Sequence, residues 1–207
     1  MYKIIDLANF RRKATFDFYK SFEDPFYNIT CNVDISNLYT FCKKNNHSIF
    51  LGTLHACMQA ANEIPEFKQR LIDDQVIQYE KINPGSTILK DDETFTFAYF
   101  DYHPDFISFQ KEGKEEINLR KKSVDLEPEK ERKDLIFFSS IPWISFTQFK
   151  HARSGKVDSI PRIVFGKYFS QGESLMMPIS IEVHHALVDG IHVGKFVEKF
   201  TALLSSY

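Results

Sequence analysis

The sequence predicts an α+β fold, a two-layer sandwich in which helices cover a mixed β-sheet. Segments with strand-like alternation and segments with helical periodicity mix along the whole chain, without a repeat or a linker between them. The chain ends in a strand, a tight loop and a helix. Its 207 residues are 43% hydrophobic and 26% charged, values typical of one soluble globular domain. We therefore expect a single domain over residues 1–207.

Four elements are predicted in the first half of the chain. Residues 36–46 form a short helix with Ser36 as its N-cap. A second helix runs from Phe50 to Ile64 and ends near Pro65, which cannot continue it. Residues 76–80 and 94–101 are predicted strands, and in the second of these aromatic side chains alternate with Thr94, Thr96 and Ala98.

Residues 110–134 carry 16 charges, eight of each sign. Because the signs cancel over so short a stretch, this segment is expected to be a solvated helix and loop rather than a binding surface.

The second half is predicted to be richer in strands. Residues 136–139, 144–149, 162–169 and 175–185 are expected strands, and the last has the strongest pattern. Residues 190–205 give the strongest helix, because one face carries a continuous apolar stripe of Val193, Phe196, Val197, Phe200, Leu203 and Leu204.

Composition excludes several classes of function. A net charge of -2 gives no electrostatic reason to bind nucleic acid or an anionic membrane. No apolar run approaches the roughly 18 residues of a membrane span, and no apolar segment follows the N-terminus as in a signal peptide. The three cysteines lack metal-ligand spacing and are expected to be reduced thiols of a cytoplasmic protein.

The aromatic content is high for a chain of this size, with 21 Phe, 9 Tyr and 1 Trp. So many rings require a large core, an interface, or a pocket for a flat apolar ligand.

The candidate chemistry lies in the turn between the last strand and the last helix, His184-His185-Ala186-Leu187-Val188-Asp189-Gly190. Period-two alternation places His185 in line with the apolar side chains of the strand, and His184 on the opposite face. An imidazole that is partly desolvated and held by its neighbours favours its neutral, basic form. This is a suitable setting for a general base.

Three interpretations of His185 compete. It can be a core histidine satisfied by hydrogen bonds, which is the usual case for a lone buried histidine. It can join Asp189 and His192 in a metal site, although the opposed faces of His184 and His185 remove the obvious paired ligands. It can also take a proton from a hydroxyl nucleophile during acyl transfer.

The sequence resembles a known family at this point. HHxxxDG after a strand is shared by several coenzyme A-dependent acyltransferases, and the longer run VHHALVDGIHVGKF (183–196) is similar to chloramphenicol acetyltransferases in particular. Three further segments agree in the same order, namely FRRKATFDFY (10–19), SSIPWISFTQF (139–149) and GKYFSQGESLMMPISIEV (166–183). Condensation domains share the motif but are about twice as long, and dihydrolipoyl acyltransferase cores usually place Arg after its first His.

The resemblance implies a mechanism. His185 is the base that removes the acceptor's hydroxyl proton while the oxygen attacks the thioester of acetyl-CoA, in a ternary complex without an acyl-enzyme. Its tautomer is held partly by a bond to its own backbone carbonyl. Asp189 pairs with Arg12 and braces the loop, and Ser139 stabilises the developing oxyanion.

The resemblance also implies partners and binding residues. Acetyl-CoA is a co-substrate rather than a tightly bound cofactor, chloramphenicol is the acceptor, and no metal is required. The protein is a homotrimer with its active sites at subunit interfaces. Coenzyme A lies near Trp143, Lys167 and Tyr168. The acceptor lies near Phe18, Tyr19, Tyr27, Phe95, Phe97 and Val164.

The chain departs from the family at the acceptor side. Val164 stands where the family usually has a Thr that holds a water, and Glu23 and Pro25 replace residues that are commonly Leu and Cys. Two alternatives therefore stay open. One is the same chemistry on another hydroxyl acceptor, a xenobiotic or a metabolite. The other is a non-catalytic relative that binds coenzyme A or an aromatic ligand.

Overall fold

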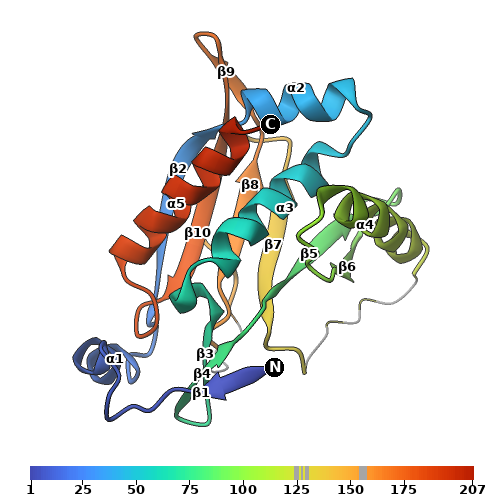
Figure 1. Ribbon diagram of the computed structural model, residues 1–207. Coiled ribbons are helices and arrows are strands. Elements are labelled where there is room, and N and C mark those ends of the chain that lie inside the picture. Colours follow the sequence, from blue (N-terminus) through green and yellow to red (C-terminus); the bar gives the residue numbers. More distant parts are fainter. Residues whose placement is uncertain (124–125, 127, 129–130, 154–157) are drawn as a thin grey trace.

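A computed structural model describes residues 1–207 apart from 124–125, 127, 129–130 and 154–157, so part of the charged 110–134 segment lies outside the described residues. In the part described, helices pack together over one face of a mixed sheet, with α3 (Ile49–Asn62) and α5 (Gly190–Ser205) lying along the strands (Figure 1). The α+β class predicted from the sequence is confirmed. No helix among the described residues is long and apolar enough to cross a membrane.

The main sheet has the strand order β2-β10-β8-β7-β5-β6, with β9 paired to β10. Its β5–β7 and β7–β8 pairs are parallel and the others antiparallel. The strands are β2 (Phe26–Asp34), β5 (Asn83–Leu89), β6 (Phe95–Tyr99), β7 (Leu135–Ile141), β8 (Arg162–Gly166), β9 (Phe169–Gln171) and β10 (Ser174–His184).

A second, smaller sheet lies beside the N-terminus (Figure 1). It consists of β1 (Tyr2–Ile4), β4 (Gln75–Tyr79) and β3 (Gln69–Ile72) in the order β1-β4-β3. The other helices are α1 (Lys13–Tyr19), α2 (Ser36–Lys44), a 3₁₀ helix (Pro65–Lys68) and α4 (Phe106–Lys121).

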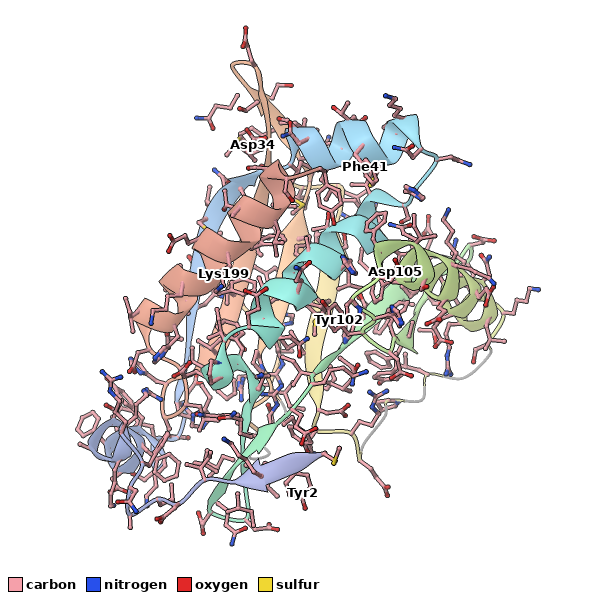
Figure 2. All side chains as sticks on the ribbon, in the orientation of Figure 1. Tyr2, Asp34, Phe41, Tyr102, Asp105 and Lys199 are labelled. Carbon is pink, nitrogen blue, oxygen red and sulfur yellow. The ribbon has the colours of Figure 1, made fainter. Side chains whose placement is uncertain are left out.

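The core lies between the helices and the sheet, where Figure 2 shows side chains filling the space and labels the buried Tyr102. From β10 it receives Ile179, Ile181 and Val183, which are fully buried. From α5 it receives Phe196 and Phe200, also fully buried. Both segments therefore have the apolar faces that their sequence periodicity predicts.

Two strand predictions are wrong in detail. Residues 144–149 do not form a strand, and residues 162–169 divide into β8 and β9. Phe146 of the first segment packs instead over the end of β8, where Gly166 leaves room for it. A Cβ at Gly166 would lie only 2.8 Å from the Phe146 ring. The apolar residues of this segment therefore cover other elements rather than pair with a strand edge.

Ser36 is also not the N-cap of α2, because that position belongs to Ile35. The Ser36 hydroxyl donates to Asp34 Oδ1 at 2.5 Å and accepts from Leu175 N at 2.8 Å. It therefore ties the start of α2 to β10, a contact between residues 139 positions apart that local sequence does not reveal.

Candidate active site

The loop that follows β10 is held by backbone hydrogen bonds. Leu187 N and Val188 N both donate to the carbonyl oxygen of His184, which closes a tight turn. His185 N donates to Pro25 O at 2.8 Å, just before the start of β2. His185 therefore lies just beyond the last residue of β10, at the end of the sheet rather than within the core. With about a third of its side chain exposed, the imidazole is partly desolvated, as the sequence predicts.

Arg12 and Asp189 form a paired contact across this loop. Arg12 Nε donates to Asp189 Oδ2 at 2.8 Å, and Nη2 donates to Oδ1 at 2.5 Å. The same guanidinium donates to the backbone carbonyls of Ala186 and His185, at 3.0 and 3.2 Å. Burial alone would raise the pKa of Asp189, but the bonds from Arg12 outweigh burial and lower it. The carboxylate therefore stays ionised and braces the loop.

The His185 imidazole lies between aromatic rings, with about a third of the side chain exposed. The Tyr19 ring stacks on it at 3.9 Å between centroids and 6° between planes, and the Tyr27 ring lies 4.6 Å away. His185 Nδ1 is 3.3 Å from Asp189 Oδ1, but the two atoms are not aligned as a hydrogen bond.

Nδ1 makes no hydrogen bond to any described residue, so the bond to its own carbonyl that the resemblance implies is not formed. That carbonyl accepts from Arg12 instead. Ring stacking and the nearby Asp189 carboxylate therefore orient the imidazole, and Nε2 has no hydrogen-bond partner among the described residues.

His192 supports the same loop in a way that sequence reasoning missed. Its Nδ1 accepts a hydrogen bond from Asp189 N at 2.8 Å, and its Nε2 lies 3.5 Å from Glu66 Oε1. His192 thus holds the backbone of Asp189 and does not point to a shared metal. The described residues contain no group of three or more His, Cys, Asp or Glu placed to hold a metal ion.

A buried network of charges lies on the other face of β10. Glu182 is buried and lies 3.2 Å from Arg153 Nη1 and 3.4 Å from Arg162 Nη1. The Arg153 guanidinium also covers the Phe26 ring at 3.3 Å from its centroid. These contacts anchor the Arg153 side chain to β10 and β2.

Two buried, neutral histidines in this region make the free energy of unfolding depend on pH. Burial lowers the pKa of His184 from 6.5 to about 4, and burial likewise lowers that of His151 to about 4. Nearby Glu182 opposes the shift at His151, whereas Arg153 and Arg162 add to it. The unfolded chain binds these protons more readily. Their contribution to stability is therefore complete above pH 6.5 and is lost as the pH falls toward 4.

We expect urea denaturation to give a free energy of unfolding that changes little between pH 7.5 and about 6.5 and then falls as the pH is lowered to 4.5. His151→Phe removes one of the two groups and keeps the ring contact with Phe149, so its free energy should fall less steeply. An unchanged slope in this variant would contradict the assignment of His151 as buried and neutral.

Ser139 lies elsewhere, on the sheet face that is opposite to the helices. It pairs with Val164 of β8, and Val164 pairs with Ser180 of β10. On its other side, Ser139 Oγ is 3.2 Å from Thr87 Oγ1 of β5, and Thr87 pairs with Phe97 of β6. One row across the sheet therefore contains Phe97, Thr87, Ser139 and Val164. Of these, Val164 is fully buried.

The register separates Ser139 from His185 within one chain. Through Val164, Ser139 is level with Ser180 of β10, which is two strands away from it across the sheet. Along the chain, Ser180 lies five residues before His185. At the usual rise and spacing of strands, this is about 17 Å along the sheet and about 10 Å across it. The two side chains therefore cannot act on the same bond within one copy of the chain.

Two of the three predicted coenzyme A residues, Trp143 and Tyr168, line neighbouring cavities. One, of about 380 Å³, is lined by Trp143, Thr87, Ser140 and Pro142 among others. The next, of about 140 Å³, shares Ser140 and Pro142 and is lined by Tyr168. Lys167 lines neither cavity; its backbone N–H donates to Ile144 O.

The predicted acceptor residues fall into two groups. Tyr19 and Tyr27 contact His185, and the largely exposed Phe18 contacts Tyr19. The rings of Phe95 and Phe97 contact each other at the far edge of the sheet, beside Thr87.

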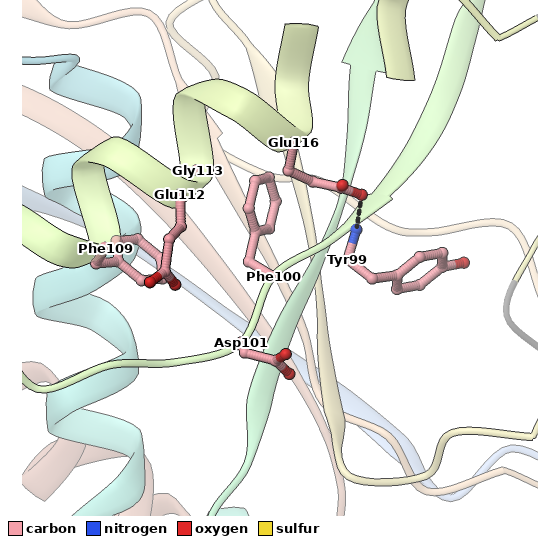
Figure 3. A pocket seen from close by; sticks show the side chains of 7 residues that line it. All are labelled: Tyr99, Phe100, Asp101, Phe109, Glu112, Gly113 and Glu116. Carbon is pink, nitrogen blue, oxygen red and sulfur yellow. Dashed lines mark hydrogen bonds between the residues drawn. The ribbon is translucent and has the colours of Figure 1, made fainter. Parts of the chain in front are cut away.

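Two further cavities lie outside these groups. Glu23, Asp24, Lys150, His151 and Arg153 line one of about 440 Å³ next to Pro25. The other, of about 180 Å³, lies between α4 and the end of β6, where Glu116 accepts from Tyr99 N (Figure 3). Glu23, one of the acceptor-side positions where the chain departs from the family, lines the first of them, and no other residue predicted for the site lines either one.

Comparison with known proteins gives consistent matches over nearly the whole chain. A model of the chloramphenicol acetyltransferase family matches residues 1–201. The chain is 29% identical to a chloramphenicol acetyltransferase of Escherichia coli over 201 residues, covering 96% of this chain and 91% of that protein. It is 30% identical to one of Clostridium butyricum, covering 100% of this chain and 96% of that protein.

Solved structures agree. A chloramphenicol acetyltransferase superposes with a TM-score of 0.92 at 33% identity, covering 99% of this chain and 100% of that one. A probable dihydrolipoamide acetyltransferase of Listeria monocytogenes superposes with a TM-score of 0.68 at 17% identity, covering 98% and 93%. The second match indicates a shared fold alone. The first supports the coenzyme A-dependent acyltransferase fold that the resemblance implies.

Proposed function

Because this chain belongs to the chloramphenicol acetyltransferase family and is an acyltransferase, we propose that it transfers acetyl from acetyl-CoA to a hydroxyl group of chloramphenicol. The observation that carries the proposal is the held imidazole of His185. Tyr19 stacks on it, the Arg12–Asp189 pair braces its loop, and its Nε2 has no hydrogen-bond partner among the described residues. Such a nitrogen is available to accept a proton.

In the proposed reaction both substrates are bound together. Nε2 of His185 takes the proton of the acceptor hydroxyl while its oxygen forms a bond to the thioester carbonyl carbon. The tetrahedral intermediate then breaks its carbon–sulfur bond, and the imidazolium returns the proton to the departing thiolate. Asp189 carries its charge next to Nδ1, so it stabilises the imidazolium without itself taking a proton.

Ser139 is the proposed donor to the negative oxygen of that intermediate. A hydroxyl aimed at the place where charge develops contributes about 3–4 kcal/mol to lowering the barrier. The cavity lined by Trp143 is also lined by Thr87, whose hydroxyl lies 3.2 Å from Ser139 Oγ, and this supports a route for the pantetheine arm of acetyl-CoA on this part of the sheet. We place the rest of coenzyme A near Tyr168 and Lys167.

The separation of His185 from Ser139 supports a site shared between two copies of the chain. We propose a homotrimer in which His185, Tyr19 and Tyr27 of one subunit face Ser139, Phe95 and Phe97 of the next. A closed ring of identical contacts then gives three equivalent sites. Each site would enclose a flat aromatic acceptor between rings of both subunits. We further propose that the enzyme acts in the cytoplasm and holds no tightly bound cofactor.

One observation favours a different acceptor as the second candidate. The cavity next to Pro25 carries Glu23 and Asp24, and Pro25 itself contacts the backbone of His185. Lys150 and Arg153 line the same cavity, and Lys150 pairs with Asp24, so the wall is charged without being acidic overall. A charged wall so close to the base suits a hydroxyl acceptor with polar groups better than an apolar one.

The proposal is tested by mixing pure protein with acetyl-CoA and chloramphenicol and following free thiol. We expect thiol release that depends on chloramphenicol and yields its acetyl ester. Release with a panel of other alcohols but not with chloramphenicol would favour the second candidate. Thermal stabilisation by coenzyme A without turnover on any alcohol would instead identify a non-catalytic relative.

A further inference from the structure

Ser139 shares a hydrogen bond with one other hydroxyl. Its Oγ lies 3.2 Å from Oγ1 of Thr87, which projects from the adjacent parallel strand β5. Thr87 follows Ser86, and Ser86 pairs with Phe138, so the two hydroxyls lie side by side on the same sheet face. Among the described residues, no other group forms a hydrogen bond with the Ser139 hydroxyl.

Val164, the neighbour of Ser139 on the side opposite to Thr87, has no side-chain group that could form a hydrogen bond with it. Val164 pairs with Ser139 from β8 and is fully buried, and its side chain has neither a donor nor an acceptor. The orientation of the Ser139 hydroxyl is therefore determined from the β5 side alone, in the part of the chain that the structure describes.

We propose that Thr87 is a positioning residue that donates its hydroxyl hydrogen to Ser139 Oγ and so directs the Ser139 hydrogen away from the sheet, toward the developing oxyanion. The inference rests on the proposed function, which assigns the oxyanion to Ser139. A serine hydroxyl has one hydrogen and rotates freely about its C–O bond. When Thr87 occupies one of its lone pairs, the hydrogen no longer points at Thr87 and remains free for the substrate.

The contact with Thr87 also makes the Ser139 hydroxyl a stronger hydrogen-bond donor. In a chain of two hydroxyls each hydrogen bond polarises the next, so Ser139 becomes a better donor while it accepts from Thr87. Thr87 is also one of the residues that line the cavity with Trp143, the proposed position of the pantetheine arm. The gain grows as negative charge develops on the carbonyl oxygen, and it should therefore appear in kcat rather than in substrate binding.

The test compares Thr87→Val, which keeps the shape and removes the hydroxyl, with Thr87→Ser, which keeps the hydroxyl. We expect Thr87→Val to lower kcat about 10-fold while the KM values for acetyl-CoA and for the acceptor change less than about twofold. Thr87→Ser should stay within about threefold of wild-type kcat. The matched control is Thr96→Val, a buried threonine on the neighbouring strand β6 whose side chain lies on the other face, and its kcat should be unchanged.

A double-mutant cycle then separates positioning from packing. Ser139→Ala should lower kcat about 100-fold or more, and adding Thr87→Val to it should change kcat less than about twofold, because no serine hydroxyl remains to be oriented. Additive losses, or a loss confined to KM, would overturn the role of Thr87 while leaving the proposed function intact. A wild-type protein that releases no thiol with any alcohol would overturn both.

Discussion

The His185→Ala variant is expected to acetylate its acceptor at a kcat about 10²- to 10⁴-fold below wild type, the range that one positioned general base contributes. Water is the remaining base in this variant, and it is not held next to the acceptor hydroxyl. The measurement is thiol release at saturating acetyl-CoA and acceptor. Because the imidazole is about a third exposed and lies outside the core, the thermal midpoint should change little.

The control for His185 is His103→Ala. The His103 side chain is exposed, and its Nδ1 accepts only from Asp105 N at the start of α4. This variant should retain wild-type kcat. If His185→Ala retained it as well, another group would have to accept the proton, and the proposed role of His185 would be wrong.

Active sites shared between subunits predict that two inactive variants restore each other. When His185→Ala and Ser139→Ala chains are produced together, random mixing gives one site in four an intact histidine and an intact serine. We expect the mixed protein to reach about a quarter of wild-type kcat per site, whereas each variant alone stays at or below about 1%. The measurement is thiol release by the whole mixture; when two affinity tags are used to select mixed trimers alone, each trimer holds one intact site in three and the expected value is about a third of wild type.

The matched control pairs His185→Ala with a chain that carries both substitutions. No chain in that mixture contributes an intact histidine, so its activity should stay at the level of His185→Ala alone. The same low activity in the first mixture would mean that both residues act within one chain, and the shared site would be excluded.

Local periodicity was enough to predict the elements that form the centre of the fold. The helix over 190–205 has the predicted bounds, and the strand over 175–185 differs from β10 by one residue at each end. Both segments carry an unbroken apolar face. Burying that face against the core determines how each segment is rotated about its own axis. Residues 144–149 are equally rich in apolar side chains, but there the same property reflects packing against other elements. Composition cannot distinguish a residue that pairs in a sheet from one that covers it.

The sequence by itself determined the α+β class, the family, and the turn that carries His185 and Asp189, because each depends on residues close together in the chain. Only the tertiary structure decided which distant residues meet. It brought Thr87 to Ser139 and kept His185 and Ser139 apart, and it confirmed the Arg12–Asp189 pair that the resemblance implies. The physical reason is that alternation and helical period are local properties of the chain. Strand order and register arise from the burial of whole faces, and they determine which side chains are neighbours across the sheet.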